Sequence, residues 1–125
     1  MPRLLLQHPC AFRPRVRGPC QPDRRMIIYA VELEMEATLR EEYLVWLRTH
    51  VAEMLTFPGF LGAEILTRRD PAPAAGRWVV CVHYRLRDRA AWEGYLARDA
   101  ARMRAAGVAR FGDRVRASRQ LLEPA

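Results

Sequence analysis

The sequence predicts an α+β fold in which four strands and two helices follow one another in the order β-α-β-β-α-β. The strongest observation is Trp78–Leu86, a segment without glycine or proline that is rich in β-branched and aromatic side chains, as is typical of a strand. Ile27–Leu33 has the same character. Residues 39–55 and 89–105 instead carry apolar side chains at three- and four-residue spacings, which predicts amphipathic helices. Both faces of Trp78–Leu86 are largely apolar, so we expect this strand in the middle of a sheet that is covered on both sides.

The first helix is expected to begin at Thr38 and to end near Leu55. Thr38 and Glu41 have the spacing of a capping box, in which the hydroxyl and the carboxylate each accept a backbone hydrogen bond at the start of the helix. Pro58 and Gly59 follow the helix and prevent it from continuing. Its apolar stripe consists of Leu39, Tyr43, Trp46, Leu47, His50, Val51, Met54 and Leu55.

Turn-forming residues divide the rest of the chain. Asp88 is expected to cap the second helix and Gly107 to end it. The apolar stripe of this helix consists of Trp92, Tyr95, Leu96 and Met103. The expected ranges are a strand at Phe60–Arg68, a loop at 70–76, a helix at Arg89–Ala105, a connector at Val108–Arg114 and a strand at Val115–Leu122.

This order of elements is the ferredoxin-like, or split βαβ, pattern. Right-handed crossovers place the first and third strands side by side in the centre of a four-stranded antiparallel sheet, with both helices on one face. The other face is too apolar to leave in water, and the chain offers no third layer to cover it. We therefore expect a homodimer that pairs sheet to sheet, since a twofold interface uses one patch twice. The residues that require this cover are Ile28, Ala30, Val79, Cys81 and Leu122.

The first 25 residues differ in composition from the rest of the chain. They hold six of the 21 basic residues and one acid, so most of the net charge of +7 lies there, while residues 26–125 are nearly balanced. They show no hydrophobic periodicity, and their apolar run is too short for a secretory signal. We expect a disordered basic leader at 1–25 and a single domain at 26–125, with Met26 as the first residue of the native protein. A basic arm that contacts nucleic acid is the alternative.

Cysteine spacing and hydropathy predict a cytoplasmic protein. Cys10, Cys20 and Cys81 form no CxxC pair and no metal-ligand spacing, so we expect neither a disulfide framework nor a metal site. This usage is typical of a reducing compartment. No apolar run of about 18 residues is present, so we expect no membrane-spanning segment and no membrane partner.

Two segments resemble a known family. Glu42–Phe60 has the pattern Glu-Tyr-Leu-x-Trp-Leu-x-x-His-Val-x-Glu-Met-Leu-x-x-Pro-Gly-Phe, and Arg110–Arg119 has the pattern Arg-Phe-Gly-Asp-Arg-Val-x-Ala-Ser-Arg. They resemble a bacterial family of short proteins known as a domain of unknown function, which is similar to the dimeric α/β-barrel superfamily of the antibiotic-biosynthesis monooxygenases. The resemblance covers Met26–Pro124. It implies two ferredoxin-like subunits packed sheet to sheet, with small ligands held between helices and sheet, and it implies no particular reaction.

His83 is the first candidate for chemistry. It lies in the middle of the central strand, on the face that it shares with Cys81 and Arg85, and it can act as a general base if a carboxylate lies nearby. The alternative is a histidine that is hydrogen-bonded within a dimer interface. Cys81 itself is either a nucleophile activated by Arg85 or a small buried hydrophobe.

His50 is the second candidate. It follows Trp46 by one helical turn, so the two can line a pocket between helix and sheet, and a satisfied core histidine is the alternative. Tyr29 and Trp92 are further ligand-binding candidates, although aromatic residues at such positions usually form the core. Arg114, Arg116 and Arg119, with Asp113, predict either a surface ion-pair cluster or an anion site.

The sequence argues against several classes of function. An RNA-recognition sheet needs aromatic residues on the exposed face of its third strand, where Val79 and Cys81 lie, so we expect no nucleic-acid partner. No phosphate-binding glycine loop, zinc pattern or nucleophile elbow is present, and we expect no cofactor. The sequence therefore predicts a homodimer that binds a small ligand without an assignable reaction. A cofactor-independent monooxygenase acting on a small aromatic substrate is the alternative, and whether the protein is an enzyme stays open.

Overall fold

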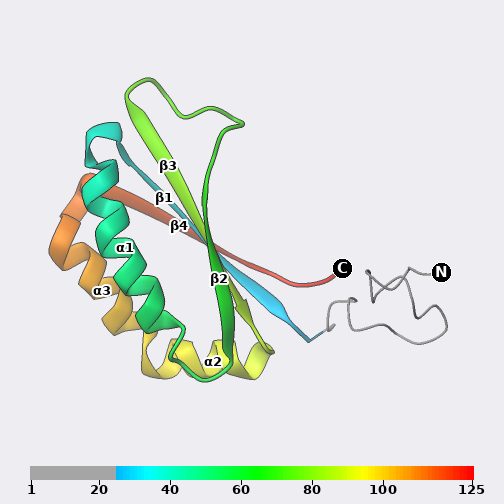
Figure 1. Cartoon of the computed structure of the whole chain (residues 1–125). Helices are drawn as coiled ribbons and strands as arrows, with labels where there is room; N and C mark the ends of the chain where they lie inside the picture. Colours follow the sequence, from blue (N-terminus) through cyan, green and yellow to red (C-terminus); the bar gives the residue numbers. More distant parts are fainter. Residues whose placement is uncertain (1–24) are drawn as a thin grey trace, which may run out of the picture.

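The computed structural model describes residues 25–125 of the chain, and the predictions made for the leader fall on residues outside this part. Seven regular elements form the domain (Figure 1). In chain order they are β1 (Ile27–Glu36), α1 (Arg40–Met54), β2 (Phe60–Thr67), β3 (Arg77–Leu86), α2 (Arg89–Arg98), α3 (Ala100–Phe111) and β4 (Val115–Leu122). Two short 3-10 turns join them, η2 (Ala37–Leu39) before α1 and η3 (Gly112–Arg114) before β4.

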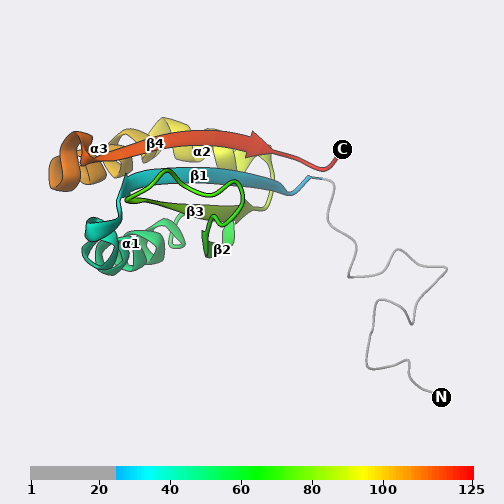
Figure 2. The same ribbon diagram turned by 90° about the horizontal axis from the view of Figure 1, so that it is seen from above.

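The four strands form one sheet in the order β2-β3-β1-β4, and every neighbouring pair is antiparallel. Figure 2 shows the strands side by side, with β2 and β4 at the edges. This arrangement confirms the ferredoxin-like α+β fold and the central place of Trp78–Leu86. β1 and β3 are paired over their full lengths, from Ile27 opposite Leu86 to Glu36 opposite Arg77.

The core lies between the helices and one face of the sheet, because alternate residues of the two central strands point toward the helices. In β1 and β3 these residues are buried: Ile27, Tyr29, Val31, Leu33, Met35, Trp78, Val80, Val82, Tyr84 and Leu86. α1 and α3 run side by side over them (Figure 1), and the rings of Tyr43 and Phe111 meet at 4.9 Å between the two helices. Apolar burial of this kind is the main favourable term of folding.

The predicted capping box at Thr38 was wrong. β1 continues to Glu36, three residues beyond its predicted end, so Thr38 falls inside η2 and is exposed. The backbone N–H of Ala37 donates to the carbonyl of Gly76 over 2.8 Å, and no side chain caps η2 or α1. The hydrogen bond between Ala37 and Gly76 thus holds the chain just before η2, and no capping box forms at Thr38.

The prediction of one helix over Arg89–Ala105 was also wrong. The backbone turns at Asp99, with φ −129° and ψ −22°, and this residue separates α2 from α3. α3 then continues through Gly107 to Phe111, so most of the predicted connector is helical. Gly112, with φ +59°, ends the helix instead. The predicted cap of α2 is confirmed, since Oδ1 of Asp88 accepts a hydrogen bond from the backbone of Ala91 over 2.9 Å.

Candidate functional site

A cavity of about 90 Å³ lies between α1, α3 and the helix-facing side of the sheet. β4 covers less of it than the central strands do, because the helix-facing residues Ala117 and Arg119 are exposed. On the opposite side of the opening, Val108 of α3 has 66% of its surface exposed. The cavity is therefore open to solvent between α3 and the β4 edge. Aromatic side chains supply much of its wall: Tyr29, Tyr43, Trp46, Tyr84, Tyr95 and Phe111.

His50 lines this cavity from α1. Its ring stacks on that of Trp46, one helical turn earlier, with centroids 4.5 Å apart and planes 21° from parallel. Burial lowers the pKa of His50, and the negative charge of Glu53 opposes this shift only in part. The imidazole is consequently neutral at pH 7 and can accept a proton.

Two arginines also line the cavity, Arg104 from α3 and Arg119 from β4. Nη2 of Arg104 donates to the hydroxyl of Tyr29 over 3.4 Å, while its Nε is buried and has no hydrogen-bond partner within residues 25–125. No aspartate or glutamate of the described chain is among the lining residues, and neither arginine pairs with a carboxylate of this part of the chain. The cavity wall is therefore aromatic and positively charged.

Tyrosine hydroxyls add neutral hydrogen-bonding groups to the wall. Burial raises the pKa of Tyr43 and of Tyr95, and the positive charge of Arg119 opposes both shifts. Arg104 opposes the shift of Tyr95 as well. Burial also raises the pKa of Tyr84. These phenols stay protonated near neutral pH, so they can donate hydrogen bonds but cannot act as bases.

The structure brings some predicted site residues together and separates others. Tyr29, Trp46 and His50 share the cavity wall. Trp92 is not among the lining residues; its ring packs on that of Tyr29 at 4.7 Å and supports it from outside the cavity. His83 lies on the opposite face of the sheet, opposite Ala30 of β1 and Glu64 of β2, so it cannot act together with His50 at one site.

Cys81 shares the outer face with His83. Burial raises the pKa of the Cys81 thiol, the negative charge of Glu32 raises it further, and Arg68 opposes both effects. A raised pKa leaves less thiolate at neutral pH, and the thiolate is the nucleophilic form. The surroundings of Cys81 therefore do not activate it as a nucleophile, and its interpretation as a small, partly buried apolar side chain agrees better with the structure.

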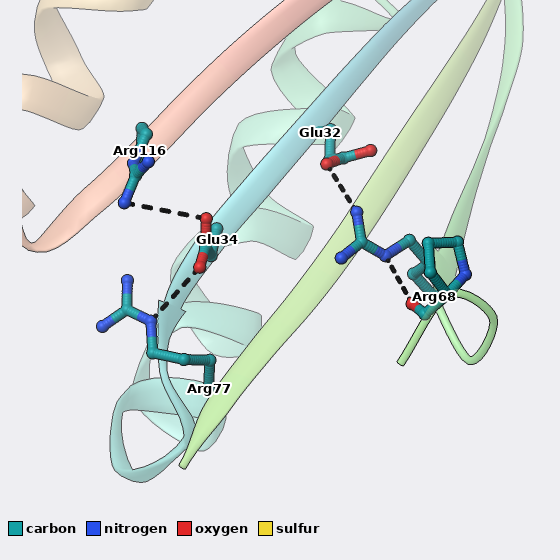
Figure 3. A network of polar contacts seen from close by, with 6 residues as sticks. Glu32, Glu34, Arg68, Arg77 and Arg116 are labelled. Carbon is teal, nitrogen blue, oxygen red and sulfur yellow. Dashed lines mark hydrogen bonds and ion pairs between the residues drawn. The ribbon is translucent and has the colours of Figure 1, made fainter. Parts of the chain in front are cut away.

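The outer face of the sheet is more polar than the sequence predicted. Glu32 pairs with Arg68 at 2.9 Å, and Glu34 pairs with Arg77 at 3.4 Å and with Arg116 at 3.8 Å. Figure 3 shows this network on the face that is turned away from α1. These ion pairs lie on the half of the outer face that is nearer to the C-terminal end of β1.

Val79 lies within this network and is only 1% exposed. The backbone N–H of Arg68 donates to the carbonyl of Val79, and Glu34 of β1 pairs with Val79 in the sheet. Charged residues therefore flank Val79 on both sides. The expectation that Val79 needs a partner chain was wrong, because the protomer covers it. Ile28, Ala30 and Cys81 are half-buried, and Leu122 of the predicted patch is exposed.

The predicted cluster of Arg114, Arg116 and Arg119 does not form. Arg114 donates to the carbonyl of Phe111 at the end of α3, Arg116 pairs with Glu34 on the outer face, and Arg119 lines the cavity. Alternate residues of a strand point to opposite faces, which sends Arg116 and Arg119 to different sides of the sheet. Arg104 is the cavity residue that the sequence reasoning missed, whereas Arg119 was a candidate for an anion site together with Arg114 and Arg116 and lines the cavity without them. The signal for Arg119 was its place between Ala117 and Leu121 on the helix-facing side of β4.

Residues 26–125 match a family described as a domain of unknown function (DUF4286). The chain belongs to this family. The match begins where the predicted domain begins and includes every element that lines the cavity. No curated protein matches the chain. The family description specifies no reaction.

Solved structures share the fold at low sequence identity. A dimeric ferredoxin-like protein from an uncultured marine organism is 10% identical, with a TM-score of 0.63, over 80% of this chain and 95% of that one. The cofactor-independent oxygenase SnoaB from Streptomyces nogalater is 17% identical, with a TM-score of 0.56, over 80% and 93%. The de novo designed protein Foldit4 is 11% identical, with a TM-score of 0.56, over 80% and 99%. A designed protein among these neighbours illustrates that the likeness concerns the fold and not the activity.

Two further features concern membrane-spanning helices and metal sites among the described residues. Among the helices of the described residues, none is long and apolar enough to cross a membrane. Within residues 25–125, no three His, Cys, Asp or Glu side chains come together in a way that could hold a metal ion.

Proposed function

We propose that this protein is a homodimer in which each protomer binds a small ligand in the cavity between the helices and the sheet. The observation that carries the proposal is the composition of the cavity wall. Aromatic residues supply much of the wall, and the polar residues His50, Arg104 and Arg119 line the cavity with them. Concave, largely apolar sites with a few convergent polar groups are the usual form of small-ligand sites. A cytoplasmic location belongs to the same proposal.

The dimer part of the proposal rests on the outer face of the sheet. Leu66 and Leu122 on this face are 44% and 42% exposed, and the half-buried Ile28 and Ala30 lie in the strand between them. The same face carries acids and arginines in similar number, so two copies can meet without net repulsion. A twofold axis places one such mixed patch against its own copy. The similar marine protein is described as dimeric, which supports this assembly.

Ligand binding can be tested by blocking the cavity. A Cβ at Gly107 would lie 3.4 Å from Cη2 of Trp46, so the longer side chain of Gly107→Leu must extend into the cavity. Ala105→Leu places the same side chain at an exposed position of the same helix. In a screen of one-ring aromatic fragments by NMR, we expect binding to the wild-type full chain and to Ala105→Leu, and none to Gly107→Leu. Equal binding to both variants, or no binding to the wild type, would contradict the proposal.

The dimer can be tested by its mass. Ala30 is half-buried in the centre of the outer face, so Ala30→Glu would place an uncompensated charge inside the proposed interface. Ala101→Glu makes the same change at an exposed position of α3. By light scattering, we expect the wild type and Ala101→Glu to have the mass of a dimer and Ala30→Glu that of a monomer. A monomeric wild type would refute this part of the proposal.

A second candidate is a cofactor-independent oxygenase that acts on a small aromatic substrate, and the state of His50 favours it. A neutral imidazole in a cavity that two guanidinium groups also line can remove a proton from an activated methylene group, while the arginines stabilise the resulting anion. The anion then gives its electrons to O₂, and loss of water converts CH₂ and O₂ into C=O and H₂O. The similar SnoaB is described as a cofactor-independent oxygenase.

The oxygenase candidate requires His50 for the reaction but not for ligand binding. If it holds, a bound aromatic substrate with an acidic methylene group consumes one O₂ per turnover, and His50→Gln removes this consumption while ligand binding persists. Oxygen-electrode measurements on the full chain test it, with 2-indanone, a ketone with one aromatic ring and acidic methylene groups, as the probe. Binding without oxygen consumption in the wild type would leave the ligand-binding module as the function and exclude this reaction for the probe.

A further inference from the structure

Among the described residues, the charged side chains that line the cavity are both arginines. Arg104 and Arg119 approach it from α3 and β4, and the described lining residues include no carboxylate that could neutralise them. The chain is not short of acids, since Glu42 and Glu53 of α1 form ion pairs with other arginines, Arg110 and Arg102. The positive charge of the cavity is therefore a property of this site and not of the whole domain.

Arg104 is the more buried of the two arginines, and part of its hydrogen-bonding capacity is unused. Its only hydrogen bond within residues 25–125 is the long one to the Tyr29 hydroxyl, and its Nε is buried without a partner. A buried polar group without a hydrogen bond costs free energy, and this cost is larger when the group is charged. Such groups are rare in folded proteins and call for a reason. An anion bound in the cavity, which Arg104 lines, would compensate the positive charge of this guanidinium group.

Arg119 acts on the same space from the other side. It is exposed at the opening, and its charge reaches Tyr43 and Tyr95, which line the cavity. An anion that enters past β4 would thus meet Arg119 first and Arg104 further in. Guanidinium groups bind carboxylates with two parallel hydrogen bonds, which gives them an advantage over a point charge.

We propose that the cavity takes a small planar aromatic acid, bound as its anion between Arg104 and Arg119 with its ring among the aromatic side chains. The inference rests on the ligand-binding function proposed above and names the class of ligand. The volume of about 90 Å³ limits the enclosed part to about one ring, with any larger portion extending into the opening beside β4. The stack of Trp46 and His50 and the tilted rings of Tyr43 and Phe111 provide the apolar surface for that ring.

The test compares matched probes on the wild-type full chain by calorimetry. Benzoate has both the ring and the charge, benzamide has the ring alone, and acetate has the charge alone. We expect benzoate to bind at least about tenfold more tightly than either of the others, which corresponds to about 1.4 kcal/mol. Benzamide binding as tightly as benzoate would leave the cavity as a ligand site and overturn the anion preference. Acetate binding as tightly as benzoate would overturn the aromatic part, and no binding of any probe would count against both the inference and the proposed function.

Variants then assign the preference to the two arginines. Arg104→Gln and Arg119→Gln are each expected to reduce the ratio of benzoate to benzamide affinity about tenfold. Arg48→Gln removes the same charge from an exposed position of α1 and is expected to leave the ratio unchanged. If Arg104→Gln does not fold, Arg119→Gln and the wild-type comparison still decide the matter. A ratio that is the same in wild type, Arg119→Gln and Arg48→Gln would overturn the proposed role of the guanidinium groups.

Discussion

His50 shows how a single side chain of α1 acquires its properties from its surroundings. The spacing of four residues between Trp46 and His50 was enough to predict that the two side chains lie on one face of a helix. It could not predict how deeply the imidazole is buried, because that depends on α3 packing over α1. Burial is the largest influence on the pKa of His50, so the property that matters for proton transfer comes from the tertiary structure.

The lowered pKa of His50 predicts a pH dependence of stability. The unfolded chain takes up the proton near the ordinary pKa of 6.5, whereas the folded chain takes it up only at lower pH. The unfolded state therefore binds more protons as the pH falls below 6.5, and the free energy of unfolding decreases through the folded pKa. In urea denaturation from pH 8 to pH 4.5, we expect this decrease to be smaller in His50→Gln than in the wild type. Parallel curves for the two proteins would show that His50 titrates alike in both states.

At the scale of elements, the alternation of residues predicted a strand with its correct limits, whereas the limits of the second helix were predicted wrongly. Val115–Leu122 was predicted with the limits that the structure shows, because turn residues bound a short alternating segment. Gly107 was expected to end a helix, yet it lies inside α3, where it faces the Trp46 ring. A glycine can serve to end a helix or to allow close packing, and the sequence of one helix does not distinguish the two. The turn at Asp99 has no sequence signal that we can identify.

Two glycines with positive φ allow a matched test of how α2 is held against the turn before β2. Gly59 has φ +84°, its carbonyl accepts from the backbone of Arg87, and an added Cβ would collide with the Cβ of Ala91. Gly76 has φ +76° with open space around it. Gly76→Ala is expected to lose about 1 kcal/mol of stability from backbone strain alone, and Gly59→Ala at least about 2 kcal/mol, since the collision adds to the strain. Urea denaturation measures both, and equal losses would mean that α2 moves away without cost.

For the whole molecule, the sheet separates two surfaces that the sequence could not tell apart. The alternation of β4 predicted that Arg119 shares a face with Ala117 and Leu121, but only the packing of α3 shows that this face borders a cavity. Arg104 was hidden for a similar reason, because its direction depends on where α3 begins. The outer face was predicted to be apolar. Its ion pairs were not predicted, because their arginines come from the ends of three different strands. Contacts between elements that are distant in the sequence therefore decided both the cavity and the outer face.

The proposed dimer predicts that stability depends on protein concentration. If two protomers associate through their outer faces, unfolding separates them, and dilution favours the separated unfolded chains. A tenfold increase in concentration is worth about 1.4 kcal/mol per dimer, or about 0.7 kcal/mol per protomer, which for about 100 ordered residues raises the unfolding midpoint by about 3 °C.

Thermal scans of the wild type across a hundredfold range of concentration provide the measurement. We expect the midpoint to rise in the wild type and in Gly107→Leu, because the cavity lies on the helix side of the sheet and the interface on the other. In Ala30→Glu the midpoint should not change with concentration. A wild-type midpoint that is constant over this range would mean that the protomer is stable alone, with Ile28, Ala30 and Cys81 sufficiently protected by its own ion pairs.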